Sequence, residues 1–103
     1  MKSPDSFPFS LKSMLGKHVH LVGIGGCGMS GLARLLRNLG CNVQGTDVIP
    51  SITTEALIDD GFDVAMQQDG SMLSNGIDLV VYSAAIPRSH IELRRAEELD
   101  IPL

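Results

Sequence analysis

The residues with the clearest chemistry lie in one glycine-rich segment, Gly23-Ile24-Gly25-Gly26-Cys27-Gly28. Its spacing satisfies G-x-G-x-x-G. The first glycine allows a tight turn, the second lets the backbone approach a phosphate, and the third lets a helix pack closely on a strand. A helix that starts here directs unpaired N–H groups and the positive end of its dipole at a ligand. The segment therefore predicts a loop that binds the diphosphate of a nucleotide; the alternative is a glycine-rich turn kept for packing.

An acidic residue follows this segment at a distance that suits a nucleoside. Asp47 lies 19 residues after Gly28, at the end of a strand that we expect over residues 42–46. A carboxylate in this position accepts hydrogen bonds from ribose hydroxyls. An aspartate at the end of a strand also caps turns, so both roles stay open for Asp47.

No other group of residues predicts catalysis or metal binding. Cys27 and Cys41 form no CxxC pair, and His18 and His20 share one face of a strand without a third ligand. We interpret these histidines as polar residues at a strand end, and we expect no metal site and no catalytic residue. An ATP-binding P-loop is excluded because Leu11 stands where G-x-x-x-x-G-K-[ST] requires its first glycine.

Hydrophobic periodicity places these residues among alternating strands and helices. Apolar runs predict strands over residues 19–24, 42–46, 62–66 and 77–82. A helix that ends at Gly40 is predicted by leucines at helical spacing, namely Leu32, Leu35, Leu36 and Leu39. Two further helices are expected, over residues 54–61 and from the capping box S-x-x-E at 89–92. The alternation indicates an α/β fold, a Rossmann-like parallel sheet with helices on both faces.

The two ends of the chain suggest how it is organised. Residues 1–16 show no periodicity, so we predict a flexible tail, followed by one Rossmann-like domain over residues 17–103. The last residues, Ile101-Pro102-Leu103, read as the start of a fifth strand that is cut off. We therefore expect this sequence to be the first domain of a longer protein.

Composition excludes several classes of function. The chain has 103 residues and a net charge of −4, and its eight Lys and Arg residues are scattered, which argues against binding nucleic acid through phosphate neutralisation. No apolar run approaches the roughly 20 residues that span a bilayer, and the N-terminal residues lack the apolar stretch of a signal peptide. We expect a cytoplasmic domain with neither a nucleic-acid nor a membrane partner.

The glycine segment and its surroundings resemble the Mur ligase family. The opening motif of that family is similar to HLVGIGGCGMSGLA at residues 20–33, and three further stretches follow in the same order, at 45–47, 78–87 and 96–103. The resemblance implies an N-terminal domain that binds the UDP part of UDP-N-acetylmuramic acid in a ligase that forms an amide bond. It also implies that ATP and magnesium bind in a central domain, so this domain alone is expected to be inactive.

The resemblance also implies a set of ligand-binding residues. The diphosphate would lie against the backbone N–H groups of Gly25, Gly26, Cys27, Gly28, Met29 and Ser30. Asp47 would lie at the nucleoside end, and the turn that contains Ser83, Ala84 and Ala85 would line the cleft. One departure affects the uracil contacts, because Gln67-Gln68 stand where the family often has Gly-His. Arg88 is either a contact for an anionic ligand or a solvated surface arginine.

Several functions stay open at this point. The sequence of the glycine loop resembles that of the branch of the family that joins L-alanine to UDP-N-acetylmuramic acid. The murein peptide ligases, which attach a recycled tripeptide to the same sugar, share the pattern. The same glycine spacing, together with Asp47, also suits an NAD-binding oxidoreductase domain or a regulatory module that senses a nucleotide.

Overall fold

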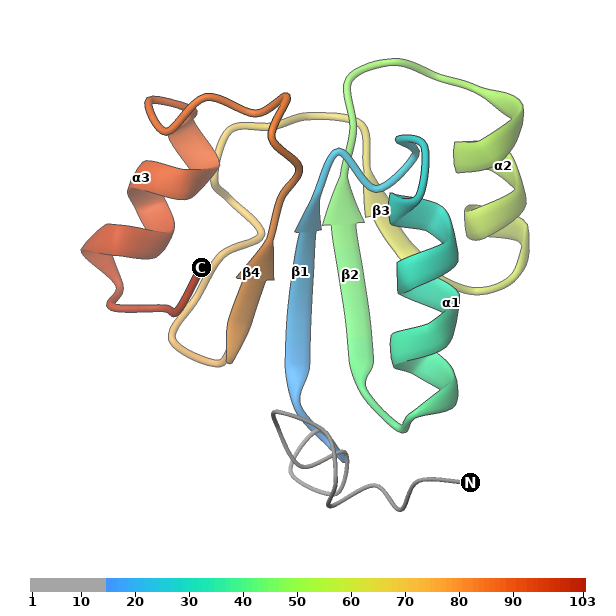
Figure 1. Ribbon diagram of the computed structural model, residues 1–103, viewed down its shortest axis with the longest axis horizontal. Helices are drawn as coiled ribbons and strands as arrows, with labels where there is room; N and C mark the ends of the chain where they lie inside the picture. The colour runs from blue at the N-terminus through green and yellow to red at the C-terminus, as the bar shows by residue number, and fades with distance from the viewer. Residues whose placement is uncertain (1–14) are drawn as a thin grey trace.

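The protein is built around a four-stranded parallel sheet, as the computed structural model shows for residues 15–103 (Figure 1). The strands are β1 (His18–Val22), β2 (Asn42–Thr46), β3 (Asp63–Ala65) and β4 (Leu79–Val81), in the spatial order β3-β2-β1-β4. Every pairing between neighbours is parallel. The predicted α/β class with a Rossmann-like parallel sheet is confirmed.

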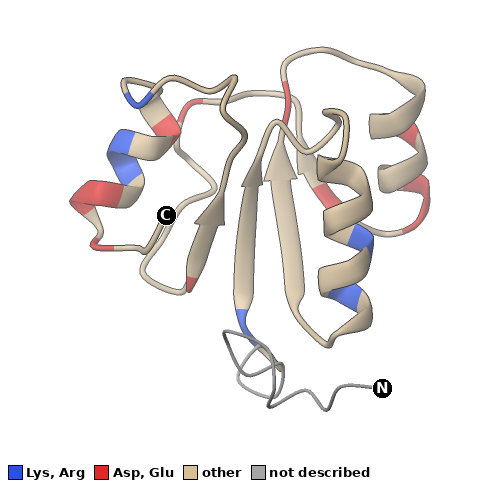
Figure 2. Ribbon diagram, in the orientation of Figure 1, with Lys and Arg blue, Asp and Glu red and all other residues tan. Residues whose placement is uncertain are grey.

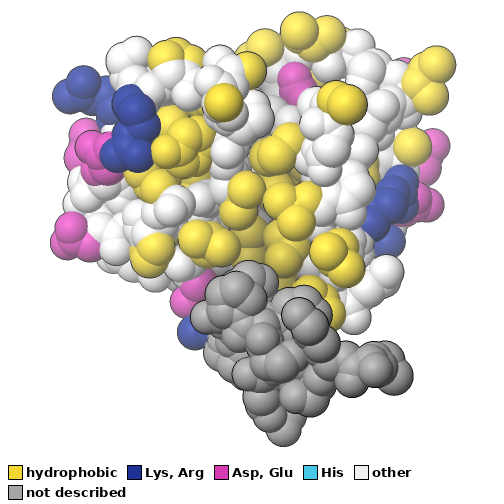
Figure 3. Space-filling model, in the orientation of Figure 1, with side chains coloured by type: hydrophobic (Ala, Val, Ile, Leu, Met, Phe, Trp, Pro, Cys, Tyr) yellow, Lys and Arg dark blue, Asp and Glu magenta, His cyan; other side chains and the backbone are white. Residues whose placement is uncertain are grey.

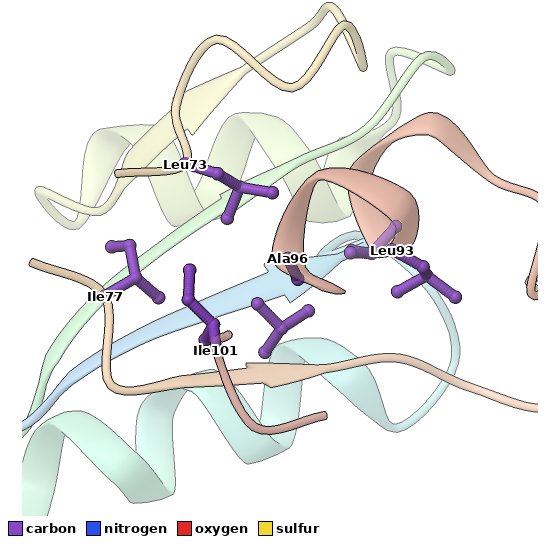
Figure 4. Close-up of a cluster of buried hydrophobic side chains, with 7 residues drawn as sticks. Leu73, Ile77, Leu93, Ala96 and Ile101 are labelled. Carbon is purple, nitrogen blue, oxygen red and sulfur yellow. The ribbon is translucent and has the colours of Figure 1, made fainter. Parts of the chain in front are cut away.

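Helices cover both faces of this sheet, as predicted. Side chains alternate along β1, so Leu21 packs in the cluster with α1 (Met29–Asn38) and α2 (Ile52–Asp59). Val22 points the other way and packs with α3 (Ile91–Glu98) and the crossover from β3 to β4. Figure 4 shows this second layer, in which apolar side chains of α3, the crossover and the chain end meet: Leu93, Ala96, Leu73, Ile77 and Ile101.

The strand order places a topological switch point beside β1. The strands β2 and β3 add on one side of β1, whereas β4 adds on the other. The carboxyl ends of β1 and β4 therefore flank the crevice in which open parallel sheets bind their ligands. The glycine segment follows β1 and the Ser83 turn follows β4, so the topology brings these two distant segments to one edge of the sheet (Figure 1).

Three strands are shorter than their apolar runs. The strand predicted over 19–24 ends at Val22, because Gly23 turns the chain with φ +77. The strands predicted over 62–66 and 77–82 span 63–65 and 79–81. The flanking Phe62 and Ile77 are 5% and 8% exposed, so these apolar residues fill the core without joining the hydrogen-bond ladder.

The second helix begins two residues before the position predicted from its pattern. Ser51 is its N-cap and forms a reciprocal capping box with Thr54: the Thr54 N–H donates to Ser51 Oγ (3.1 Å), and the Ser51 N–H donates to Thr54 Oγ1 (2.9 Å). The predicted end at Gly61 is two residues late, since α2 ends at Asp59. Gly61 adopts a left-handed conformation, φ +90, after the helix. Because the residue at the third helical position is threonine rather than Glu or Gln, the sequence pattern for a capping box was absent.

The capping box predicted at Ser89 is wrong. His90 is the N-cap of α3, and its Nδ1 accepts the hydrogen bond of the Glu92 N–H (3.1 Å). The Glu92 side chain does not reach back to the helix start, because it is fully buried and bonds to His20 and Thr46. The predicted pattern therefore found the start of α3 but assigned the wrong capping residue and the wrong partners to Glu92.

The first helix ends as predicted, before a left-handed Gly40 (φ +92), but its buried face differs from the leucine pattern. Met29, Ala33 and Leu36 are buried, whereas Leu35 is 55% exposed. Apolar side chains gather between α3 and α1, over β4 and β1 (Figure 3). Leu32, Leu79 and Val81 are partly buried and pack against the core cluster that contains Val19 and Leu36.

The two ends of the chain differ in how far the structure describes them. Of the predicted tail over 1–16, residues 1–14 lie outside the described residues, and Leu15-Gly16 form a turn. Residues 101–103 form no assigned strand. They nevertheless run along the free side of β4, where the Val80 N–H donates to the Pro102 carbonyl (2.9 Å) and Ile101 is buried.

The two serines give a matched test of these helix starts. Ser51→Ala removes a cap that satisfies the Thr54 N–H, so the free energy of unfolding should fall by about 1 kcal/mol. Ser89→Ala removes an exposed side chain outside the cap of α3 and should change it by less than about 0.5 kcal/mol. Urea denaturation measures both values; a larger effect at Ser89 than at Ser51 would contradict the observed caps.

Candidate functional site

The glycine loop leaves the end of β1 and is held by the neighbouring strand β2. The Gly23 and Ile24 N–H groups both donate to the Thr46 carbonyl, at 2.8 and 3.0 Å. The Gly25 N–H donates to Asp47 Oδ2 (2.9 Å). Three successive N–H groups of the loop therefore bind two successive residues of β2 and its end, which fixes the first half of the loop.

The second half of the loop keeps several N–H groups unpaired. The Gly26 and Met29 N–H groups are used within the loop, by the carbonyls of Gly23 and Gly26. α1 begins at Met29, without a side-chain cap and without an acidic residue in its first turn. Four N–H groups at this helix start have no hydrogen-bond acceptor among the described residues: those of Cys27, Gly28, Ser30 and Gly31. Unpaired N–H groups and the positive end of the helix dipole together suit an anion.

The loop offers this anion no positively charged side chain. Figure 2 shows Lys and Arg on α1 and α3, just before α3 and at the start of β1, but none along the glycine loop. Stabilisation of a negative ligand here would therefore come from backbone dipoles, as at other helix N-termini.

Asp47 joins the loop to the segment that follows β2. Its Oδ2 accepts from Gly25, and its Oδ1 accepts from the Val48 and Ile49 N–H groups, at 2.8 and 3.2 Å. A carboxylate has about four lone-pair sites, so these three bonds leave room for one more donor. The contact of Asp47 with a ribose hydroxyl stays a prediction. Its observed hydrogen bonds connect the glycine loop to the segment that follows β2.

The start of α2 packs behind the loop, which the sequence did not indicate. A Cβ placed on Gly25 would lie 2.5 Å from Thr54 Cγ2, 2.9 Å from Asp47 Oδ2 and 3.6 Å from Ser51 Oγ. Only glycine fits at this close approach. Ser51 and Thr54 were not predicted as part of the site, because the helical pattern begins only at residue 54.

The turn after β4 lies against the same loop. The Ala85 and Ile86 N–H groups donate to Ser83 Oγ (3.3 Å) and to the Ser83 carbonyl (3.0 Å), which closes a turn with Ala84 and Ala85 exposed. A Cβ on Gly23 would lie 3.9 Å from Ile86 Cδ1. The structure therefore brings the predicted glycine and serine segments side by side.

Two residues near this edge are engaged within the protein. Gln68 donates to Thr46 Oγ1 (3.3 Å) and accepts from His90 Nε2 (3.1 Å), whereas Gln67 is exposed. Arg88 donates to the Tyr82 hydroxyl (2.9 Å) and to Glu97 (2.7 Å), and these two partners raise its pKa above the ordinary arginine value. Arg88 is exposed, and its role as a contact for an anionic ligand stays a prediction.

The cysteines and histidines do not assemble into a cluster. Cys27 is exposed in the loop, whereas burial raises the pKa of the Cys41 thiol. His18 is exposed, but His20 is fully buried, so our interpretation of both as polar strand-end residues is wrong for His20. Within residues 15–103, no group of three or more His, Cys, Asp or Glu side chains is arranged to hold a metal ion. None of the helices in this range is long and apolar enough to cross a membrane.

Sheet order, switch point and glycine loop place the molecule in the Rossmann-like class of α/β domains. The chain belongs to the Mur ligase family: residues 18–103 match the family model described as Mur ligase family, catalytic domain. This confirms the resemblance seen in the glycine segment.

Curated relatives of this chain are named as ligases. UDP-N-acetylmuramate–L-alanine ligase of Syntrophomonas wolfei is 44% identical over 88 residues, which cover 85% of this chain and 19% of the relative. The ligase of the same name from Clostridium kluyveri is 46% identical over 87 residues, 84% of this chain and 19% of the relative. The chain thus spans about a fifth of the length of the curated relatives it matches.

Solved structures of two kinds of ligase share the fold. UDP-N-acetylmuramate-alanine ligase MurC from Thermotoga maritima has a TM-score of 0.77 and 28% identity, covering 82% of this chain and 20% of that one. The UDP-N-acetylmuramate:L-alanyl-gamma-D-glutamyl-meso-diaminopimelate ligase from Neisseria meningitides has a TM-score of 0.73 and 29% identity, covering 84% and 28%. The chain is similar to both.

Two glycines of the loop and its helix should respond to alanine in opposite ways. Gly25→Ala places a methyl group against Thr54 and Asp47 and should lower the free energy of unfolding by about 1–3 kcal/mol. Gly31 lies in α1 with open space around its Cα, so Gly31→Ala should raise it by about 0.5–1 kcal/mol. Urea denaturation measures both; equal effects of the two changes would contradict the close packing at Gly25.

The two thiols should differ in reactivity. Cys27 is exposed, whereas Cys41 is 5% exposed and its raised pKa keeps the thiol protonated at neutral pH. A thiol-reactive chromophore should therefore label Cys27 in the folded protein and Cys41 only after unfolding. Peptide mass mapping identifies the modified residue, and native labelling of Cys41 ahead of Cys27 would contradict the described environments.

Proposed function

We propose that this chain is the UDP-N-acetylmuramate-binding domain of an ATP-dependent ligase that joins L-alanine to UDP-N-acetylmuramic acid during peptidoglycan synthesis. The observation that carries the proposal is the set of unpaired N–H groups at the start of α1, in a chain whose relatives are named for this substrate. A domain of this kind captures and orients its ligand. The chemistry of amide formation belongs to the rest of the ligase.

The diphosphate would lie over the second half of the glycine loop. Cys27, Gly28 and Ser30 would each donate a backbone N–H to its oxygens. Gly25, Gly26 and Met29 would shape the loop, because their N–H groups are already used inside the protein. The predicted diphosphate residues therefore divide into donors and supports.

The nucleoside and the sugar would extend to either side of this loop. Asp47 would take one ribose or uracil donor with its remaining lone pair, beside the exposed Val48 and Ile49. Ser83, Ala84 and Ala85 would line the opposite wall, since their turn lies against the start of the loop. No catalytic residue is assigned to this chain.

The proposal needs partners that this chain does not supply. ATP and magnesium would bind in another domain of the ligase and activate the muramyl carboxylate as an acyl phosphate, which L-alanine then attacks. A UDP-sugar substrate suits the cytoplasm. Neither a nucleic acid nor a membrane enters the proposed reaction.

A second candidate is the tripeptide ligase of cell-wall recycling. The structure from Neisseria meningitides supports it, because its identity to this chain, 29%, equals that of the alanine ligase within one percentage point. Both enzymes are named for the same UDP-sugar and differ in the acceptor. Assaying the ligase that carries this domain with L-alanine and with the tripeptide decides between them. Faster turnover with L-alanine than with the tripeptide would support the alanine ligase, and the reverse result would support the tripeptide ligase.

Calorimetric titration of this chain with UDP, UDP-N-acetylmuramic acid, NAD and ATP tests the binding function. We expect the two uridine ligands to bind more tightly than NAD or ATP. Tighter binding of NAD would overturn the proposal and favour the oxidoreductase alternative. Binding of none of the four at millimolar concentration would overturn it as well.

A matched pair of glycines tests whether the loop holds the diphosphate. Gly28 and Gly61 both have positive φ, +83 and +90, and open space around their Cα atoms, but only Gly28 adjoins the unpaired N–H groups. Gly28→Ala should weaken UDP binding about tenfold, equivalent to ~1.4 kcal/mol. Gly61→Ala introduces similar backbone strain at the opposite edge of the sheet and should leave the Kd unchanged. Equal losses at both sites would contradict the proposed contact.

A further inference from the structure

A group of buried polar side chains lies beneath the glycine loop, between the sheet and α3. His20 of β1, Thr46 of β2 and Glu92 of α3 are each fully buried, with no exposed surface. Glu92 Oε1 accepts from His20 Nε2 (3.0 Å) and from Thr46 Oγ1 (2.5 Å). Its Oε2 is buried and has no hydrogen-bond partner among the described residues. Both bonds of this carboxylate therefore pass through one oxygen.

The neighbours of His20 fix which of its nitrogens carries the proton. Gln44 Nε2 donates to the Met72 carbonyl (3.0 Å), so this atom is the amide nitrogen. The same nitrogen lies 2.9 Å from His20 Nδ1, which must then be the acceptor. The proton is on His20 Nε2, which donates to Glu92. The imidazole is therefore held in one orientation, with Nε2 as the donor and Nδ1 as the acceptor.

The group closes into a ring through the start of α3. Gln68 donates to Thr46 Oγ1 and accepts from His90 Nε2, and His90 Nδ1 accepts from the Glu92 N–H. Thr46 Oγ1 therefore accepts from Gln68 and donates to Glu92. With both functions of its hydroxyl occupied, the Thr46 side chain is held in one orientation.

Thr46 is also the residue that holds the glycine loop. Its carbonyl accepts from Gly23 and Ile24, and the next residue, Asp47, accepts from Gly25. The side chain of Thr46 points into the polar group while its carbonyl faces the loop. A displacement of Thr46 would therefore move the acceptors on which the loop rests.

We infer that Glu92 is a positioning residue for the glycine loop and acts through Thr46. Burial of a carboxylate costs several kcal/mol, so apolar residues of the same size often stabilise a core at least as well. The apolar Leu93 and Ala96 follow Glu92 on the same helix and are buried (Figure 4). An apolar side chain at 92 would suit this layer, but it would leave the hydroxyl of Thr46 without its acceptor. The effect on ligand affinity rests on the proposed function; the effect on the loop itself does not.

Amide exchange and UDP affinity of Thr46 variants test the inference on this chain. Thr46→Val keeps the shape of the side chain and removes the hydroxyl. It should speed hydrogen exchange of the Gly23 and Ile24 amides about tenfold and weaken UDP binding about tenfold, each equivalent to ~1.4 kcal/mol. Thr46→Ser keeps the hydroxyl and should restore both values. Ile77→Val removes one methylene from the apolar layer on the same face and is the control for general destabilisation.

A double-mutant cycle tests whether Glu92 acts through Thr46. Glu92→Leu alone should weaken UDP binding as Thr46→Val does, and the two changes together should weaken it no further. Additive losses would overturn the route through Thr46. If Glu92→Leu does not fold, the Thr46 series decides: exchange at Gly23 and Ile24 no faster in Thr46→Val than in Ile77→Val would overturn the inference.

Failure of the proposed function can be told apart from failure of this inference. If the unchanged chain binds neither UDP nor UDP-N-acetylmuramic acid, the proposed function is overturned. Hydrogen exchange at Gly23 and Ile24 still decides the positioning role, because it needs no ligand.

Discussion

The conformation of the candidate site depends on the carbonyl of Thr46 and the side chain of Asp47, at the end of β2. This short stretch accepts three successive N–H groups of the glycine loop. Buried backbone N–H groups require acceptors, and here the end of β2 supplies them. The N–H groups that stay free in the loop are among those that these acceptors do not reach. The free groups are then gathered at the start of α1, where the helix dipole adds to their effect on an anion. Hydrogen bonds to the first half of the loop thus leave the N–H groups of the second half available for an anion.

The two faces of the sheet serve this edge differently. Toward α1 and α2 the contacts are apolar, and the start of α2 approaches Gly25 so closely that a side chain there is excluded. Toward α3 an apolar layer lies beside a polar group that reaches β1 and β2 through Glu92. Apolar packing is non-directional, whereas hydrogen bonds fix orientation. The polar group is therefore suited to set the position of Thr46, and the apolar layers supply the burial that stabilises the sheet.

Hydrophobic periodicity predicted much of the architecture. The errors of this prediction have a common cause. β2 was predicted over its observed residues, and the centres of the other strands and of all three helices were predicted as well. The ends were wrong where apolar residues such as Phe62 and Ile77 are buried without strand pairing. The cap at Ser89 was wrong because Glu92 has partners 72 and 46 residues away, at His20 and Thr46. A local pattern contains no information about such partners.

The sequence by itself determined the family, the α/β class and the segment that forms the loop, since glycine spacing and strand–helix alternation are local properties of the chain. Only the tertiary structure decided which N–H groups of that loop are free. The acceptors of the paired N–H groups belong to Thr46, the last residue of β2, and to Asp47, which follows it. The tertiary structure also decided that His20 is buried and donates to Glu92, whereas the sequence suggested a polar residue at the end of a strand. Parallel pairing and right-handed crossovers bring residues far apart in the chain to one edge of the sheet, and hydrogen bonds across that edge depend on register, which no local pattern specifies.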